Sequence, residues 1–328
     1  INGTVPSTTK KVNNKTYMMW KRTNVPAMAL SEAYAPNFSD LTNTIRISTI
    51  KSWKEISNWY SDLVKKNLKL DKITKKTFAE IFPNGVTGIS QEEIAKKIYS
   101  YIGNNIKYSS LDFRQSGYVP QKPSKTITTK LGDCKDVSTL FVALSQLAGM
   151  KANLVLVTTN DNGFTSMLLP SNDFNHCIVK VAIDGKDYFL ELTDKYLPFK
   201  ALPSSLYNAN ALVISFDKAE NEKSKIIAIP FDNALKNVTN AVTTMTIDDK
   251  SKSFTNTFTI SGANKSYYNE MFSDATTEDV RKKRIEEDYN SKLKKVVSLQ
   301  SSKVIKNETY DKDITFETQF SISERIQT

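Results

Sequence analysis

The sequence has little of what most metal and redox sites require. Its 328 residues include one histidine, His176, and two cysteines, Cys134 and Cys177. Two cysteines cannot form a disulfide framework, and neither belongs to a Cys-x-x-Cys spacing typical of zinc or dithiol redox centres. We therefore predict no bound metal and no cofactor. A disulfide between the two cysteines stays open as an alternative at this point.

Long apolar runs are also absent. No segment approaches the roughly 20 residues that a membrane-spanning helix needs, and no secretion signal is visible, so we expect no membrane span. Hydrophobic residues make up 39% of the chain and aromatic residues 10%, which indicates a globular protein. The length suits two or three domains rather than one.

Motifs for specific nucleic-acid binding are missing, although the net charge is +10. The basic residues gather in short runs, such as residues 281–284, that could meet nucleic acid or an anionic envelope surface. No zinc-finger spacing, aromatic RNP-like stretch or glycine-rich phosphate loop accompanies these runs. We interpret the runs as solvated helix faces and predict no specific nucleic-acid partner.

The N-terminal segment has a different pattern from the rest of the chain. Residues 1–50 alternate short apolar stretches with prolines and polar turns, most clearly at 17–20 and 45–48, which is typical of extended structure. We interpret this segment as the tail of a preceding β domain. A capping box begins at Ser52 and, with apolar residues at helical spacing, predicts a helix over residues 52–68.

A second capping box begins at Ser90 and opens another predicted helix. The segment from 109 to 129 has little periodicity and contains Gly117, Pro120 and Pro123. We predict that this segment is a loop passing over another part of the fold.

The segment from Cys134 to Ala148 has a broad apolar face and is followed by Gly149, a typical helix C-cap. Cys134 therefore occupies the first turn of a predicted buried helix. Free amide groups and the positive end of the helix dipole favour a thiolate there and could hold an oxyanion. A thiol in this position, with one histidine downstream, is the minimum equipment for nucleophilic catalysis by cysteine.

Strand patterns dominate the next part of the chain. Apolar runs predict strands over residues 154–157, 176–183 and 188–192. The Asp184-Gly185 pair is a strong signal for a two-residue turn. It predicts a hairpin between the second and third of these strands and fixes their register.

This register divides the hairpin residues between two faces. One face is almost wholly apolar and contains Cys177, whereas His176 and Glu191 share the other. Glu191 lies diagonally across from His176, and we predict that it orients the imidazole. Asp194 has the opposite parity and is the second candidate for this role. Cys177 faces away from His176, which makes a bridge to Cys134 geometrically awkward.

Residues 216–328 contain further strand patterns, at 226–229 and 254–260, and a charged helix pattern at 277–297. We predict a β-rich C-terminal domain with one charged helix. No catalytic constellation is visible in it.

Several motifs together resemble the transglutaminase-like superfamily, and within it large bacterial proteins that carry such a core between β domains of unknown function. The resemblance covers residues 52–215 well and both ends more loosely. Its motifs are Gly132-Asp133-Cys134-Lys135-Asp136, Gly117-Tyr118-Val119-Pro120, Phe174-Asn175-His176 and Tyr188-Phe189-Leu190-Glu191-Leu192-Thr193-Asp194. This chain departs from the family at Glu191, where the family usually has aspartate.

The resemblance implies an α+β fold with a papain-like transglutaminase core, in which the nucleophile helix packs on an antiparallel sheet, followed by a β-rich C-terminal domain. We accordingly divide the chain into the tail of a β domain (1–50), the core (51–215) and the C-terminal domain (216–328). The resemblance also implies an exported bacterial protein, periplasmic or associated with the envelope, and leaves room for an envelope partner.

The implied chemistry is acyl transfer through a thiol, with Cys134 as nucleophile, His176 as general base and Glu191 as the orienting acid. The main-chain amide of Cys134 would supply one oxyanion donor, and the loop with Tyr118 and Gln121 a second. The substrate would be a peptide or protein. Water as the acceptor makes a cysteine peptidase or amidase, and an amine makes a transglutaminase.

A scaffold is the alternative function. In this interpretation a catalytically weak or inactive transglutaminase-like fold serves as a binding protein of the bacterial envelope. Glu191 and the multidomain layout favour it, whereas the intact Cys134 and His176 favour an enzyme. A nucleic-acid binder is supported by charge alone.

Overall fold

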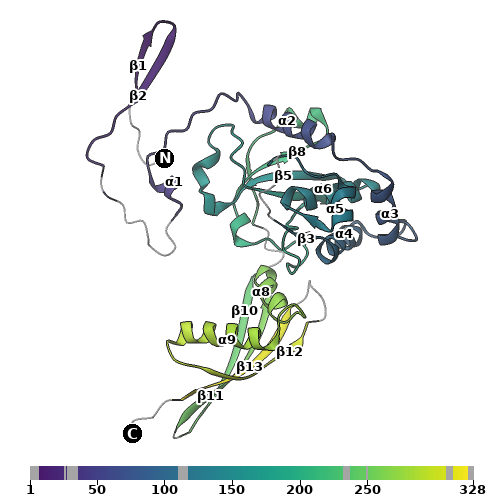
Figure 1. Cartoon of the computed structure of the whole chain (residues 1–328), viewed down its shortest axis with the longest axis vertical. Coiled ribbons are helices and arrows are strands. Elements are labelled where there is room, and N and C mark those ends of the chain that lie inside the picture. The colour runs from purple at the N-terminus through teal and green to yellow at the C-terminus, as the bar shows by residue number, and fades with distance from the viewer. Residues whose placement is uncertain are drawn as a thin grey trace.

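The computed structural model describes residues 7–25, 27, 36–109, 117–231, 237–248, 250–307 and 313–323. Within these ranges a small N-terminal hairpin stands apart from a central core of helices and sheet, and a second sheet with its own helices comes after the core (Figure 1). Both larger parts combine helices with antiparallel strands, so the predicted α+β class is confirmed.

The N-terminal hairpin pairs β1 (Ser7–Val12) with β2 (Lys15–Trp20). Its turn consists of Asn13 and Asn14, with φ angles of 47° and 62°. Asparagine tolerates this left-handed region better than most residues, which explains the tight turn. Residues 45–48, whose alternating pattern predicts extended structure, pair with no described strand and belong to no sheet.

Two core helices begin at the predicted caps. The hydroxyl group of Ser52 accepts a hydrogen bond from the first turn of α2 (Trp53–Lys65), and Ser90 does the same for α4 (Gln91–Asn105). Both helix starts are therefore confirmed. The first helix ends at Lys65, three residues before the predicted end at 68.

Two further core helices have no counterpart in the sequence prediction. α3 (Lys72–Ile81) begins after Asp71, whose carboxylate accepts a hydrogen bond from its first turn. α5 (Pro123–Thr129) lies inside the segment for which we predicted a loop, and it corrects that prediction. Proline fits the first position of a helix, but so short a helix shows little apolar periodicity. Residues 110–116 of the same segment lie outside the described residues.

The core sheet has five antiparallel strands in the order β7-β6-β5-β8-β9. These are β5 (Ala152–Thr158), β6 (His176–Ile183), β7 (Lys186–Leu190), β8 (Asn210–Ile214) and β9 (Ile227–Ala228). Outside this sheet, β3 (Lys107–Tyr108) pairs in parallel with β4 (Leu131–Gly132). β9 pairs with β8, so the core sheet continues past residue 215, the boundary that we drew from the sequence.

The predicted hairpin register is confirmed. Ile183 pairs with Lys186 across the Asp184-Gly185 turn, and Val179 pairs with Leu190. Asp184 and Gly185 have φ angles of 49° and 78°, as a two-residue turn of this kind requires.

The core sheet is buried on both faces. α6 (Cys134–Leu147) packs on one of them, where Leu140 and Leu144 share a cluster with Val179 and Val181. The opposite face is covered by the segment after β7, which contributes Leu202 and Leu206 among others. Each fully buried aliphatic side chain contributes on the order of 1.5–3 kcal/mol, so α6 and the sheet form one rigid unit.

The C-terminal part has a four-stranded antiparallel sheet in the order β10-β11-β13-β12. Its helices are α8 (Lys265–Met271) and α9 (Glu278–Leu293), and Tyr289 of α9 stacks on Phe320 of the sheet at 4.3 Å between ring centroids. The predicted β-rich character is therefore confirmed. The strands are β10 (Val238–Ile247), β11 (Ser251–Ser261), β12 (Ser298–Lys306) and β13 (Ile314–Ser323).

Short elements complete the described chain. They are α1 (Phe38–Leu41), α7 (Lys218–Asn221) and the 3₁₀ turns Asn160–Asn162, Phe164–Met167, Ser204–Leu206 and Gly262–Asn264. In the ranges that the structure describes, every helix is too short or too polar to cross a membrane.

Candidate active site

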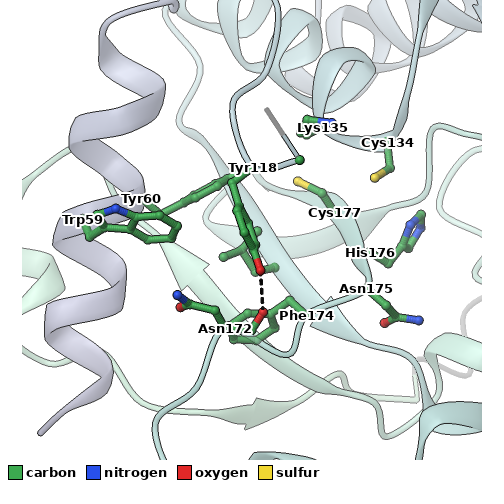
Figure 2. Close-up of a pocket in the computed structure, with 12 residues that line it drawn as sticks. Trp59, Tyr60, Tyr118, Cys134, Lys135, Asn172, Phe174, Asn175, His176 and Cys177 are labelled. Carbon is green, nitrogen blue, oxygen red and sulfur yellow. Dashed lines mark hydrogen bonds between the residues drawn. The ribbon is translucent and has the colours of Figure 1, made fainter. Parts of the chain in front are cut away.

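Cys134 is the first residue of α6 and is half-buried at the end of a small pocket (Figure 2). Its main-chain N–H is one of the groups that a helix start leaves without an intrahelical acceptor. Cys177 is buried nearby, and both cysteines are free thiols. The alternative of a Cys134–Cys177 disulfide is therefore not found.

Asp136 fixes the turn that presents Cys134. Its carboxylate accepts a hydrogen bond from the N–H of Asp133, while the Asp133 carboxylate accepts one from the N–H of Asp136, which completes a capping box. Gly132 precedes this turn, and a Cβ atom there would lie 3.1 Å from Asp136 and from Thr126. Only glycine fits this position without moving its neighbours.

His176 is the first residue of β6 and lies beside Cys134, with its side chain 16% exposed. Burial by itself lowers the pKa of the imidazole, but hydrogen bonds to Cys134 and Glu191 and the negative charges of these groups outweigh burial. The pKa of His176 is raised from 6.5 to about 10. The ring is therefore an imidazolium at neutral pH.

Glu191 lies 2.6 Å from His176, measured from Oε2 to Nε2. Its other oxygen, Oε1, accepts hydrogen bonds of 2.7 Å from both the main-chain N–H and the hydroxyl group of Thr193. Burial by itself raises the pKa of Glu191, but the hydrogen bonds from His176 and Thr193 reverse this effect and lower the pKa. The extra methylene of glutamate thus does not prevent contact with the imidazole.

Asp194, the second candidate for the orienting acid, points elsewhere. One carboxylate oxygen accepts a hydrogen bond from the N–H of Tyr196, and the other accepts one from the hydroxyl group of Ser266 in α8. The opposite strand parity of Glu191 and Asp194 accounts for this difference.

The two expected oxyanion residues take different positions. The hydroxyl group of Tyr118 lines the pocket at Cys134 and donates a hydrogen bond of 3.4 Å to the carbonyl oxygen of Asn172 (Figure 2). Gln121 does not line this pocket, because its main-chain N–H and its side-chain amide both donate to Asp136, at 2.7 and 3.1 Å. Its donors therefore brace the turn that carries Cys134.

The pocket at Cys134 is small, at about 90 Å³, and part of its wall is aromatic. Trp59 and Tyr118 meet edge to face at 5.6 Å between ring centroids, and Phe174 lies on the same wall (Figure 2). Trp59 is not among the site residues predicted from the sequence. Trp59 lies on α2 at the border of the buried face of the helix, and it is 41% exposed. This border position is the sequence signal that could have identified it as a pocket residue.

Lys135 is a further pocket residue that was not predicted from the sequence. Its side chain is only 11% exposed, and its ammonium group forms a salt bridge with Asp133. Among the described residues, no group of three or more histidine, cysteine, aspartate or glutamate side chains has an arrangement that could hold a metal ion.

A cysteine at the start of a helix that packs on an antiparallel sheet, with a histidine on that sheet, defines a papain-like α+β core. Residues 82–190 match the family model of the transglutaminase-like superfamily. This part of the chain is therefore similar to that superfamily. The matched residues include Cys134 and His176 and end immediately before Glu191.

Two solved structures are similar to the chain. One is a "putative protease" from Parabacteroides distasonis, with a TM-score of 0.48 and 12% identity over 98% of this chain and 63% of that one. The other is a "putative cysteine protease" from Cytophaga hutchinsonii, with a TM-score of 0.31 and 17% identity over 51% of each chain. This chain thus spans less than two thirds of the length of either protein. No curated protein matches it.

Proposed function

We propose that the protein is a thiol-dependent hydrolase or acyltransferase that acts on peptide or amide bonds. The observation that supports this proposal is that Cys134 and His176 line one pocket, while His176 is hydrogen-bonded to the buried Glu191. Each of these residues has the environment that its role needs, because the thiol lies at a helix start and the imidazole is held by a buried carboxylate.

The raised pKa of His176 changes the order of proton transfers from the one expected from sequence. An imidazolium cannot take a proton, so the reactive form is a thiolate beside an imidazolium before the substrate arrives. The thiolate sulfur attacks the carbonyl carbon, and the carbonyl π electrons move to the oxygen. The N–H of Cys134 stabilises that oxyanion, and the Tyr118 hydroxyl becomes a second donor once it leaves the carbonyl oxygen of Asn172.

Collapse of this intermediate breaks the carbon–nitrogen bond. His176 gives its proton to the departing amine, which leaves an acyl group on the sulfur of Cys134 and a neutral imidazole. The imidazole then takes a proton from an incoming water or amine, which attacks the acyl carbon and releases the thiolate. The ionised Glu191 stabilises the imidazolium at both ends of the cycle.

The substrate in this proposal is a peptide or protein, and water or an amine is the acceptor. The proposed location is the bacterial envelope or periplasm, and it rests on the family resemblance alone. The names of the two similar structures agree with peptide-bond chemistry for those proteins.

Alkylation of Cys134 by iodoacetamide across pH tests this function. The Cys177→Ala variant serves as the parent, so that only one thiol can react. A free thiol loses reactivity as the pH falls below about 8.5. We expect Cys134 to react rapidly down to about pH 6, and His176→Ala to lower the rate at pH 6 at least tenfold. Slow, His176-independent alkylation would instead support the non-catalytic scaffold.

A further inference from the structure

A second cleft is lined in part by the residues that directly follow Glu191, and it shares no lining residue with the aromatic pocket at Cys134. It has a volume of about 620 Å³ and is formed by the end of α4, the short strand β3 and the loop after β7. Three of its twelve lining residues are lysines, namely Lys107, Lys130 and Lys195. They come from three separate parts of the chain, so the fold brings them together.

The three ammonium groups have no carboxylate partner in the part of the chain that the structure describes. Within those ranges, Lys107, Lys130 and Lys195 form no salt bridge, whereas Lys135 beside Cys134 is paired with Asp133. Lys195 instead lies over the ring of Tyr196, 4.7 Å from its centroid.

Among the described residues the cleft has one lining carboxylate, Asp194, against three lysines. Asp194 accepts hydrogen bonds from Tyr196 and Ser266 through its two oxygens. All three lysines are exposed. The cleft therefore presents an excess of positive charge to solvent.

Two wall residues connect this cleft to the candidate site. Tyr108 pairs with Gly132 in the β3–β4 ladder, two residues before Cys134. Thr193 donates two hydrogen bonds to Glu191. Burial, together with the negative charges of Cys134, Asp133 and Glu191, raises the pKa of Tyr108 to about 12. The cleft therefore ends close to the nucleophile.

The pocket at Cys134 and this cleft differ in chemistry. The pocket with Trp59, Tyr118 and Phe174 is aromatic, and its one lysine is neutralised. The cleft with Lys107, Lys130 and Lys195 is polar and basic. A substrate that crosses Cys134 would meet apolar side chains on one side and a group of cations on the other.

We propose that the cleft formed by Lys107, Lys130 and Lys195 binds an acidic side chain of the peptide substrate, within a few residues of the bond that Cys134 attacks. This inference rests on the proposed function and names the substrate class as acidic peptides. The carboxylate exchanges water for ammonium groups that already lie together, and the positive field draws acidic peptides toward Cys134.

Matched electrophiles test this inference without knowledge of the natural substrate. The probes are iodoacetyl-glycyl-aspartate amide, the corresponding asparagine amide, and the asparagine dipeptide with a free C-terminal carboxylate. All three alkylate a thiol by the same displacement of iodide. In the Cys177→Ala parent, we expect the aspartate amide to alkylate Cys134 about three- to tenfold faster than the asparagine amide at low salt, and the advantage to shrink at high salt.

The variant K107Q/K130Q/K195Q should abolish this advantage and leave the rate of the asparagine amide unchanged. The matched control is K10Q/K11Q/K15Q, which removes three exposed lysines from the N-terminal hairpin, away from the core (Figure 1). Equal rates for the two amides in the parent, or equal losses in both triple variants, would overturn the inference. A preference for the free C-terminal carboxylate alone would also overturn it, because it would assign the charge to a terminus.

Different experimental outcomes would reject the proposed function and this inference. His176-dependent alkylation by iodoacetamide without a preference for the acidic probe would retain the enzyme and reject the acidic substrate. Alkylation that does not depend on His176 would reject the enzyme whatever the charge preference.

Discussion

Ser266 of α8 donates a hydrogen bond to Asp194, three residues after Glu191 in the loop that comes after β7. Asn269 of the same helix donates one of 2.8 Å to the carbonyl oxygen of Tyr196. The C-terminal part therefore holds the loop that contains Thr193, the residue that fixes Glu191. Helix α8 and the core, which are distant in sequence, are therefore in contact within a few residues of Glu191.

Loss of the Ser266 and Asn269 hydrogen bonds should lower the reactivity of Cys134, although neither residue belongs to the candidate active site. We expect the variant S266A/N269A to lower the alkylation rate of Cys134 at pH 6 severalfold, because Thr193 and Glu191 would hold His176 less firmly. The measurement is the iodoacetamide rate in the Cys177→Ala parent. S291A, which removes an exposed serine of α9, should leave the rate unchanged. Equal rates in all three proteins would show that α8 only packs against the core.

Glu191→Gln should shift the reactivity of Cys134 to higher pH. The amide keeps the shape of the side chain but removes the charge that raises the pKa of His176, so imidazolium is lost at lower pH than in the parent. We expect at least a tenfold lower alkylation rate at pH 7. Glu191→Asp keeps the charge but shortens the reach to Nε2, and its rate should fall between the two. A parental rate in Glu191→Gln would exclude the proposed role.

The raised pKa of His176 also predicts a pH dependence of stability. The folded protein holds this proton more tightly than the unfolded chain, whose pKa is 6.5. The resulting stabilisation is fully present below pH 6.5 and is lost as the pH rises toward about 10. Urea unfolding of the parent and of His176→Ala should therefore differ most at pH 6 and least at pH 10. Lysines and tyrosines titrate in both proteins and cancel in the difference.

Asp136→Asn should destabilise the core. The buried carboxylate accepts hydrogen bonds from the N–H of Asp133 and from two donors of Gln121, and an amide can replace only part of them. Leaving buried donors unpaired costs about 1–3 kcal/mol in the free energy of unfolding. Urea unfolding at neutral pH measures this change. Asp274→Asn, at an exposed position, is the control and should be nearly neutral.

The features that could be predicted from sequence are those set by neighbours along the chain. Ser52 and Ser90 cap helices whose first turns they precede, and the Asp184-Gly185 turn fixes which residues share a face with His176. The contact between His176 and Glu191 results from that register. Each of these depends on a few adjacent residues.

The features that could not be predicted depend on packing between distant segments. Gln121 was expected near the oxyanion, but Asp136 lies where both of its donors reach. The lysine cleft joins Lys107, Lys130 and Lys195, which no sequence spacing relates. β9 joins the core sheet because β8 offers an open edge, which is visible only once the sheet has formed.

The turn at Asp184 and Gly185 lies at the opposite end of β6 from His176, yet it sets the register that brings Glu191 to His176. Deletion of a single residue there would shift one strand against the other and exchange inward for outward positions along its whole length. Such an indel would remove the histidine–glutamate pair as effectively as substitution of either residue. The chain is therefore expected to tolerate changes in the composition of this turn far better than changes in its length.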